Sequence, residues 1–115
     1  MARRETPSRR RAAARASFPV DVADHGETFV VTADLPGLRT QDVDVSVRKD
    51  RVRIVADFGD DEGAYLRRER RRGGVSRVIR LPDAVDERRV SASYHDGLLR
   101  VTLRKRSQPR RVDVQ

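Results

Sequence analysis

The sequence predicts an all-β fold, an immunoglobulin-like antiparallel β-sandwich of seven to eight strands with disordered tails. From Phe18 onward, apolar and largely β-branched residues recur at every second position, which is typical of strands that bury one face. Turn-forming residues separate these runs at short intervals. No segment has a convincing helical period, although residues 83–89 are compatible with one short helical turn.

Seven alternating runs are expected to be strands. The strictest is residues 42–47, where Val43, Val45 and Val47 point to one face and the polar residues between them to the other. The expected strands are residues 20–22, 28–34, 42–47, 51–57, 75–81, 90–94 and 98–103.

The residues between these runs favour tight turns. Asp96-Gly97 is the strongest hairpin signal, because a type I′ turn needs positive φ at both central positions. Pro36-Gly37 stands where a type II turn prefers proline and glycine, and Lys49-Asp50 is expected to close a short hairpin. Residues 57–74 are too long a connection for a tight hairpin, and residues 65–69 within it are a candidate eighth strand that reaches another subunit's edge.

A chain of 115 residues has room for one modest core. We expect a disordered Arg-rich arm over residues 1–17, one domain over residues 18–105 and a C-terminal extension over residues 106–115. The net charge of +8 lies mostly in the tails: residues 1–18 hold six Arg and one Glu, and residues 106–115 hold three Arg and one Asp. The segment between them is nearly neutral, so nucleic acid is a weak alternative partner that would bind through the Arg-rich tails.

The composition excludes several classes of site. There is no cysteine, so disulfides, thiolate metal sites and thiol catalysis are absent. We see no apolar run of membrane-spanning length and no secretory signal, so we expect a soluble, cytoplasmic protein without membrane contact.

No catalytic constellation is found. Gly73-Gly74 lacks the context of a phosphate loop, and His25 and His95 both fall at expected turns. The acidic cluster early in the long connection does not have the spacing of a calcium loop. We therefore expect no cofactor and no metal, and a protein that is not an enzyme.

Several segments together resemble the α-crystallin domain of small heat shock proteins. Residues 33–38 (ADLPGL) and 42–47 (DVDVSV) are similar to its first half. Residues 68–70 (RER) and 75–82 (VSRVIRLP) are similar to its central segment, and residues 92–103 (ASYHDGLLRVTL) to its closing signature. The resemblance spans about residues 19–105, and Val112 and Val114 resemble the family's C-terminal I-x-I anchor.

The resemblance implies a function and a set of interaction sites. It implies an ATP-independent holdase chaperone that binds unfolding client proteins and works as a homodimer within larger homo-oligomers, with co-assembly with other small heat shock proteins left open. The implied dimer interface is formed by Tyr65, Leu66, Arg67, Arg68, Glu69 and Arg77. The implied edge groove is formed by Val43, Val45, Val47, Val90 and Ala92, and Val112 and Val114 would enter it from a neighbouring subunit.

Some features depart from the family pattern. The N-terminal arm is short and carries few large apolar residues, whereas in the family this arm contributes to client capture and assembly. Arg104 stands where the closing strand often has proline. The alternative is therefore a dedicated interaction or scaffold module of the same fold with weak or no general chaperone activity.

Overall fold

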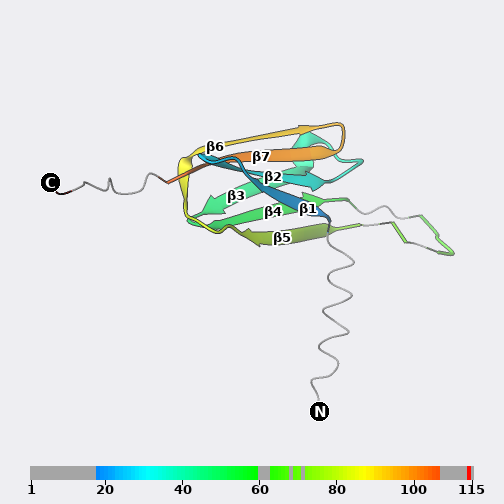
Figure 1. Cartoon of the computed structure of the whole chain (residues 1–115). Coiled ribbons are helices and arrows are strands. Elements are labelled where there is room, and N and C mark those ends of the chain that lie inside the picture. Colours follow the sequence, from blue (N-terminus) through cyan, green and yellow to red (C-terminus); the bar gives the residue numbers. More distant parts are fainter. Residues whose placement is uncertain (1–17, 60–62, 68, 71, 107–113, 115) are drawn as a thin grey trace, which may run out of the picture.

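The computed structural model of the chain describes residues 18–59, 63–67, 69–70, 72–106 and 114. These residues form seven strands joined by turns and by one long connection between β4 and β5 (Figure 1). The strands are β1 (Val20–Asp24), β2 (Thr28–Asp34), β3 (Val43–Arg48), β4 (Arg51–Asp57), β5 (Gly74–Arg80), β6 (Val85–His95) and β7 (Leu98–Lys105).

The strands form two antiparallel sheets that pack face to face. One sheet has the order β1-β2-β7-β6 and the other the order β3-β4-β5. Strands that are neighbours in a sheet are also consecutive in the chain, with one exception. β2 pairs with β7, which brings the two ends of the domain together. The predicted all-β sandwich is confirmed, and the expected strands at residues 28–34 and 51–57 have the predicted bounds.

The core lies between the sheets and is built from the inward positions of the alternating runs. Its largest fully buried side chains are Phe18, Phe29, Leu35, Ile54, Leu103, Val31, Val52, Val85 and Val101. The central strands β4 and β7 bury every second residue almost completely, whereas the inward valines of the edge strand β3 are only half-buried. This difference leaves apolar surface at the sheet edge.

The two tightest hairpins use residues in the left-handed region. Asp96 and Gly97 have φ values of 51° and 83°, as the predicted type I′ turn requires. Lys49 also has a positive φ, of 56°, in the turn between β3 and β4. These turns place β3 beside β4 and β6 beside β7 in a fixed register.

The expectation for residues 83–89 was wrong. β6 begins at Val85, and a register shift separates Val85 from Val90 in its pairing with β7. The Val85 amide donates to the Lys49 carbonyl at 2.9 Å, and the Glu87 carboxylate accepts from the Lys49 amide at 2.8 Å. These long-range hydrogen bonds hold the segment extended, and the sequence pattern does not reveal them.

The turn between β1 and β2 is tied to the end of β7 by Asp24. Its carboxylate accepts hydrogen bonds from the Lys105 ammonium and from the Gly26 amide, each at 2.9 Å. The bond from Lys105, followed by that from Gly26, lowers the pKa of Asp24 below its ordinary value. Lys105 also lies 4.6 Å from the centre of the Phe29 ring, a cation–π distance.

Candidate functional site

The edge strands β3 and β6 border a hollow on one side of the sandwich. β3 is the outer strand of the three-stranded sheet and β6 that of the four-stranded sheet, and contacts between the two strands close this side of the core. The hollow has a volume of about 230 Å³ and is lined by Thr40, Val43, Val45, Ala92, Ser93, Tyr94 and Leu99. We call it the edge groove.

The structure brings three of the five residues predicted for this groove into its lining, namely Val43, Val45 and Ala92. Val47 and Val90 lie farther along the same two strands, half-buried and outside the hollow. Ala92 is exposed, and its single methyl group leaves the centre of the groove open. The mouth of the groove can therefore admit a small branched side chain.

Tyr94 and Leu99 are lining residues that the sequence reasoning did not assign to the groove. Tyr94 continues the alternation of Val90 and Ala92 along β6 and pairs with Leu99 on β7. That alternation was the signal that could have placed Tyr94 in the groove. Thr40 comes from the 3₁₀ turn Thr40–Asp42 and carries no such signal, because the turn interrupts the period of two.

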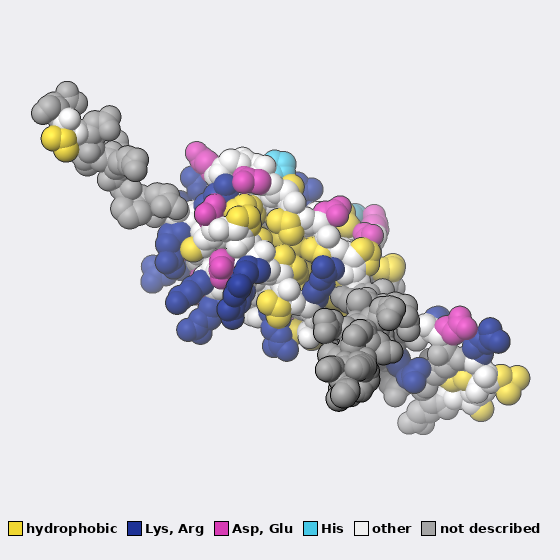
Figure 2. Space-filling model, turned by 60° about the horizontal axis from the view of Figure 1, so that its bottom comes forward, with side chains coloured by type: hydrophobic (Ala, Val, Ile, Leu, Met, Phe, Trp, Pro, Cys, Tyr) yellow, Lys and Arg dark blue, Asp and Glu magenta, His cyan; other side chains and the backbone are white. Residues whose placement is uncertain are grey.

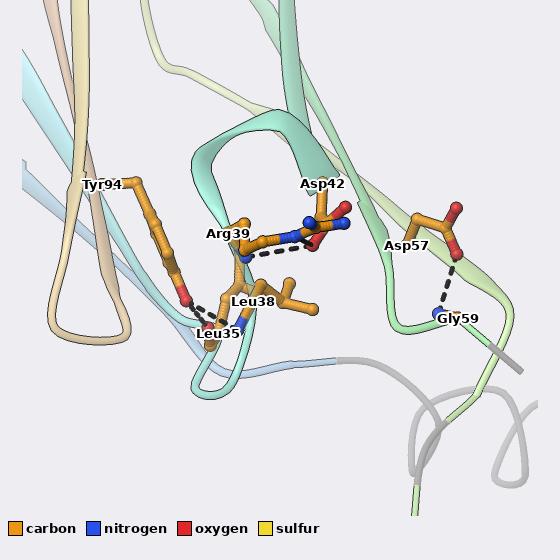
Figure 3. Close-up of polar contacts among 7 residues, drawn as sticks. All are labelled: Leu35, Leu38, Arg39, Asp42, Asp57, Gly59 and Tyr94. Carbon is orange, nitrogen blue, oxygen red and sulfur yellow. Dashed lines mark hydrogen bonds and ion pairs between the residues drawn. The ribbon is translucent and has the colours of Figure 1, made fainter. Parts of the chain in front are cut away.

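Tyr94 holds the turn between β2 and β3 against the groove. Its hydroxyl donates to the Leu35 carbonyl and accepts from the Leu38 amide at 3.2 Å (Figure 3). These two backbone groups are the first and last of the four-residue turn, in which Gly37 has a φ of 83°. The hydroxyl thus bridges the two groups that often bond directly in a type II turn.

The same turn contacts the β6–β7 hairpin through Gly97. The Leu35 amide donates to the Gly97 carbonyl at 2.7 Å. A Cβ atom on Gly97 would lie 3.1 Å from the Cα of Pro36. The two turns are therefore in direct contact, and each contains a residue with a positive φ.

The other two edge strands are β1 and β5. Arg77 on β5 pairs with the buried Ile54, so it stands on the core-side face, as the alternation predicted. It is nevertheless exposed. Its guanidinium donates to the Phe18 carbonyl at 2.8 Å, just before β1. Arg77 thus extends out of the core at the sheet edge and contacts the chain that leads into β1.

The long connection presents apolar side chains to solvent. Leu66 is fully exposed and Tyr65 is 40 % exposed. Arg67 and Glu69 lie within ion-pair distance of each other, at 3.5 Å. Residues 65–67 and 69 are not in a strand within the single chain, and Arg68 lies outside the described residues.

A hollow of about 610 Å³ lies at the base of this connection and is lined by Pro19, Asp34, Pro36, Gly37, Leu38, Phe58 and Arg70. In Figure 2 hydrophobic side chains reach the surface along the middle of the body and again on the connection. Apolar surface is thus present on both the sandwich and its longest loop.

The predicted C-terminal anchor is only partly described. Val112 lies outside the described residues, and Val114 is 95 % exposed. Within the described ranges, no group of three His, Cys, Asp or Glu residues is placed to hold a metal ion. Among the same residues, no helix is long and apolar enough to cross a membrane.

Comparison with known proteins extends these observations. The model of the Hsp20/alpha crystallin family matches residues 21–115. The chain is 36% identical to a 17.7 kDa class II heat shock protein of Arabidopsis thaliana, over 92% of this chain and 74% of that protein.

Solved structures show the same likeness. A small heat-shock protein from Xylella fastidiosa superimposes with a TM-score of 0.66 and 32% identity, covering 85% of this chain and 95% of the other. Heat shock protein 16.0 from Schizosaccharomyces pombe gives a TM-score of 0.65 and 30% identity, covering 86% and 98%. The family match, these relatives and the sandwich together show that the chain belongs to the Hsp20/alpha crystallin family, the small heat shock protein chaperones.

Proposed function

We propose that this protein is an ATP-independent holdase, which binds unfolding client proteins and limits their aggregation while working as a dimer-based oligomer. The observation that carries the proposal is the edge groove, a largely apolar hollow between two sheet edges that no other described strand pairs with. Such an edge offers backbone groups to an extended segment and pockets to its alternate side chains. Burial of apolar surface drives this kind of binding, so it needs no nucleotide.

Dimer formation is assigned to the opposite edges and the long connection. A strand formed by residues 65–69 would pair with an edge of the partner subunit and bury Tyr65 and Leu66, which are exposed in the single chain. Arg77 stands at the β5 edge, close to β1. Its guanidinium has further donors for carboxylates or carbonyls of a second chain.

Larger assembly is assigned to the tail. In an extended chain Val112 and Val114 point the same way, so both can enter the edge groove of a neighbouring subunit. Each buried valine contributes about 1.5–3 kcal/mol before ordering costs. Many such tails closing one particle give a stable oligomer from individually weak contacts. Co-assembly with other small heat shock proteins would use the same groove.

The proposal is tested by client protection. A heat-labile client is warmed with the protein at near-stoichiometric ratio and without ATP, and light scattering is recorded. We expect the rate and extent of scattering to fall, because apolar client segments bind the grooves and the exposed loop instead of one another. An inert protein at the same mass concentration is the control. Traces that match this control for several clients would refute the holdase assignment.

A dedicated interaction module of the same fold is the second candidate. The observation that favours it is the composition of residues 1–16, which hold no large apolar side chain besides Met1. Such a module would leave client scattering unchanged and still form a defined assembly. Scattering and native mass measured on the same sample therefore separate the two functions.

A further inference from the structure

The outer face of the β3-β4-β5 sheet concentrates arginines that lie far apart in the sequence. The register places Arg48 opposite Arg51 and Arg51 opposite Arg80, so three arginines form one row across the sheet. Arg53 stands on the same face one outward position farther along β4. All four are exposed. We call these four residues the arginine face.

No acidic side chain forms an ion pair with this cluster within the part of the chain that the structure describes, and Asp44 and Asp57 lie toward the other end of the same face. None of the four arginines makes a side-chain hydrogen bond or ion pair there. The outward neighbours of Arg53 are Ser46 and Val78, and Asp44 is one outward position beyond Ser46. Like charges directly opposite each other destabilise a sheet. A bound polyanion would remove that repulsion.

The shape and chemistry of the arginine face fit a phosphodiester backbone. Neighbouring strands are about 4.8 Å apart, and successive outward residues about 7 Å apart, so the guanidiniums form a flat array instead of a pocket for one small anion. Guanidiniums bind phosphate oxygens with two parallel hydrogen bonds. The outward positions of the sheet carry no aromatic side chain, so bases would have no stacking platform.

We propose that the arginine face binds nucleic acid through its phosphate backbone and without sequence preference. This activity goes beyond the proposed chaperone function. It is distinct from binding by the Arg-rich tails, because these arginines belong to the folded sheet. Figure 2 shows Lys and Arg side chains crowded at the left end of the body. β3 and β5 both run toward that end (Figure 1), and Arg48 and Arg80 are the last residues of these strands.

The test is salt-dependent binding of the full-length protein to a fluorescent DNA duplex of arbitrary sequence, followed by anisotropy. The face variant carries Arg51→Gln, Arg53→Gln and Arg80→Gln. Each phosphate contact contributes about 0.9 to the slope of log affinity against log salt concentration. We expect the face variant to lower the magnitude of that slope by about 2.7 and to weaken binding at least about tenfold at ~0.1 M salt.

Two control variants remove the same charge from other places. One carries Arg70→Gln, Arg72→Gln and Arg100→Gln, in the long connection and on the other sheet. The other carries glutamine at Arg9, Arg10 and Arg11 in the N-terminal tail. Both are expected to keep most of the slope of log affinity against log salt concentration.

A variant with lysine in place of Arg51, Arg53 and Arg80 keeps the charge and is expected to retain the slope. If the triple variant unfolds at a lower temperature than the wild type, Arg53→Gln alone replaces it in the test, with an expected slope change of about 0.9.

Three results would overturn the proposal. One is that the wild type does not bind the duplex. Another is that either control variant lowers the slope as much as the face variant does. The third is that the face variant binds DNA like the wild type but loses native mass in light scattering, which would make the face an interface between copies of the chain. None of these readouts uses a client protein, so the holdase proposal is tested separately.

Discussion

At the scale of single residues, Tyr94 links the groove to the fold. Its ring lines the edge groove, and its hydroxyl satisfies two backbone groups of the β2–β3 turn. Leu35, whose carbonyl it bonds, is completely buried. Buried backbone groups without a partner are costly, so this side chain both lines the edge groove and fixes a turn.

Tyr94→Phe is expected to destabilise the protein by about 1–3 kcal/mol, because the Leu35 carbonyl and the Leu38 amide lose their shared partner. Urea unfolding followed by circular dichroism measures the loss. The ring is retained, so the groove keeps its apolar lining. An unchanged urea midpoint would show that water replaces the hydroxyl without cost.

At the scale of elements, the β6–β7 hairpin is constrained from two directions. Its turn needs positive φ at Asp96 and Gly97, and Gly97 lies against Pro36 of another turn. The positive φ is a requirement of the local turn, whereas the contact with Pro36 is a requirement of the tertiary structure. The two can be separated because Gly26, in the β1–β2 turn, has a φ of 90° and no atom within 4 Å of the position that a Cβ would occupy.

Gly97→Ala is expected to destabilise the protein more than Gly26→Ala. Both substitutions place alanine at positive φ, at a cost of about 1–2 kcal/mol. Only the first also brings a methyl group against the Pro36 backbone. Urea unfolding of both variants gives the difference. Equal losses would mean that the β2–β3 turn moves aside freely and that the contact between the turns is not a constraint.

At the scale of the whole molecule, the fold leaves different surfaces for different contacts. The edge groove lies between β3 and β6, whereas Arg77 and the arginine face belong to β5 and the outer side of its sheet. In the proposed assembly, tail docking in the groove would therefore not compete with dimer formation at the opposite edges. Dimers and larger particles are expected to be separable by mutation.

Truncation after Arg111 is expected to leave folded dimers and to remove larger species, because the valines of the tail would no longer fill neighbouring grooves in the proposed assembly. Val112→Ala combined with Val114→Ala should act in the same way. Ala92→Trp should do so from the groove side by filling the hollow. Size-exclusion chromatography with light scattering measures the masses, with Asp113→Ser as the matched control. Native mass that survives all three changes would make the tail irrelevant to assembly.

The strands, their buried faces and the tight turns could be predicted from the order of the amino acids. The valines at 43, 45 and 47 and the Asp96-Gly97 pair carry these signals because burial on one face and positive φ are local requirements. The resemblance to α-crystallin domains could also be recognised from the sequence, because its motifs are short and lie in order along the chain. The start of β6 was not predictable, because Val85 and Glu87 are held by Lys49, a residue from another hairpin.

Which side chains meet across strands and sheets became known only from the folded chain. The lining of the edge groove depends on how β3 approaches β6, so Thr40 and Leu99 could not be assigned from spacing alone. The segment between the tails is nearly neutral in sequence, yet strand register gathers Arg48, Arg51 and Arg80 in one row. The net charge of a segment is a sum over all its residues, whereas the electrostatic field at the protein surface depends on which residues the sheet places side by side.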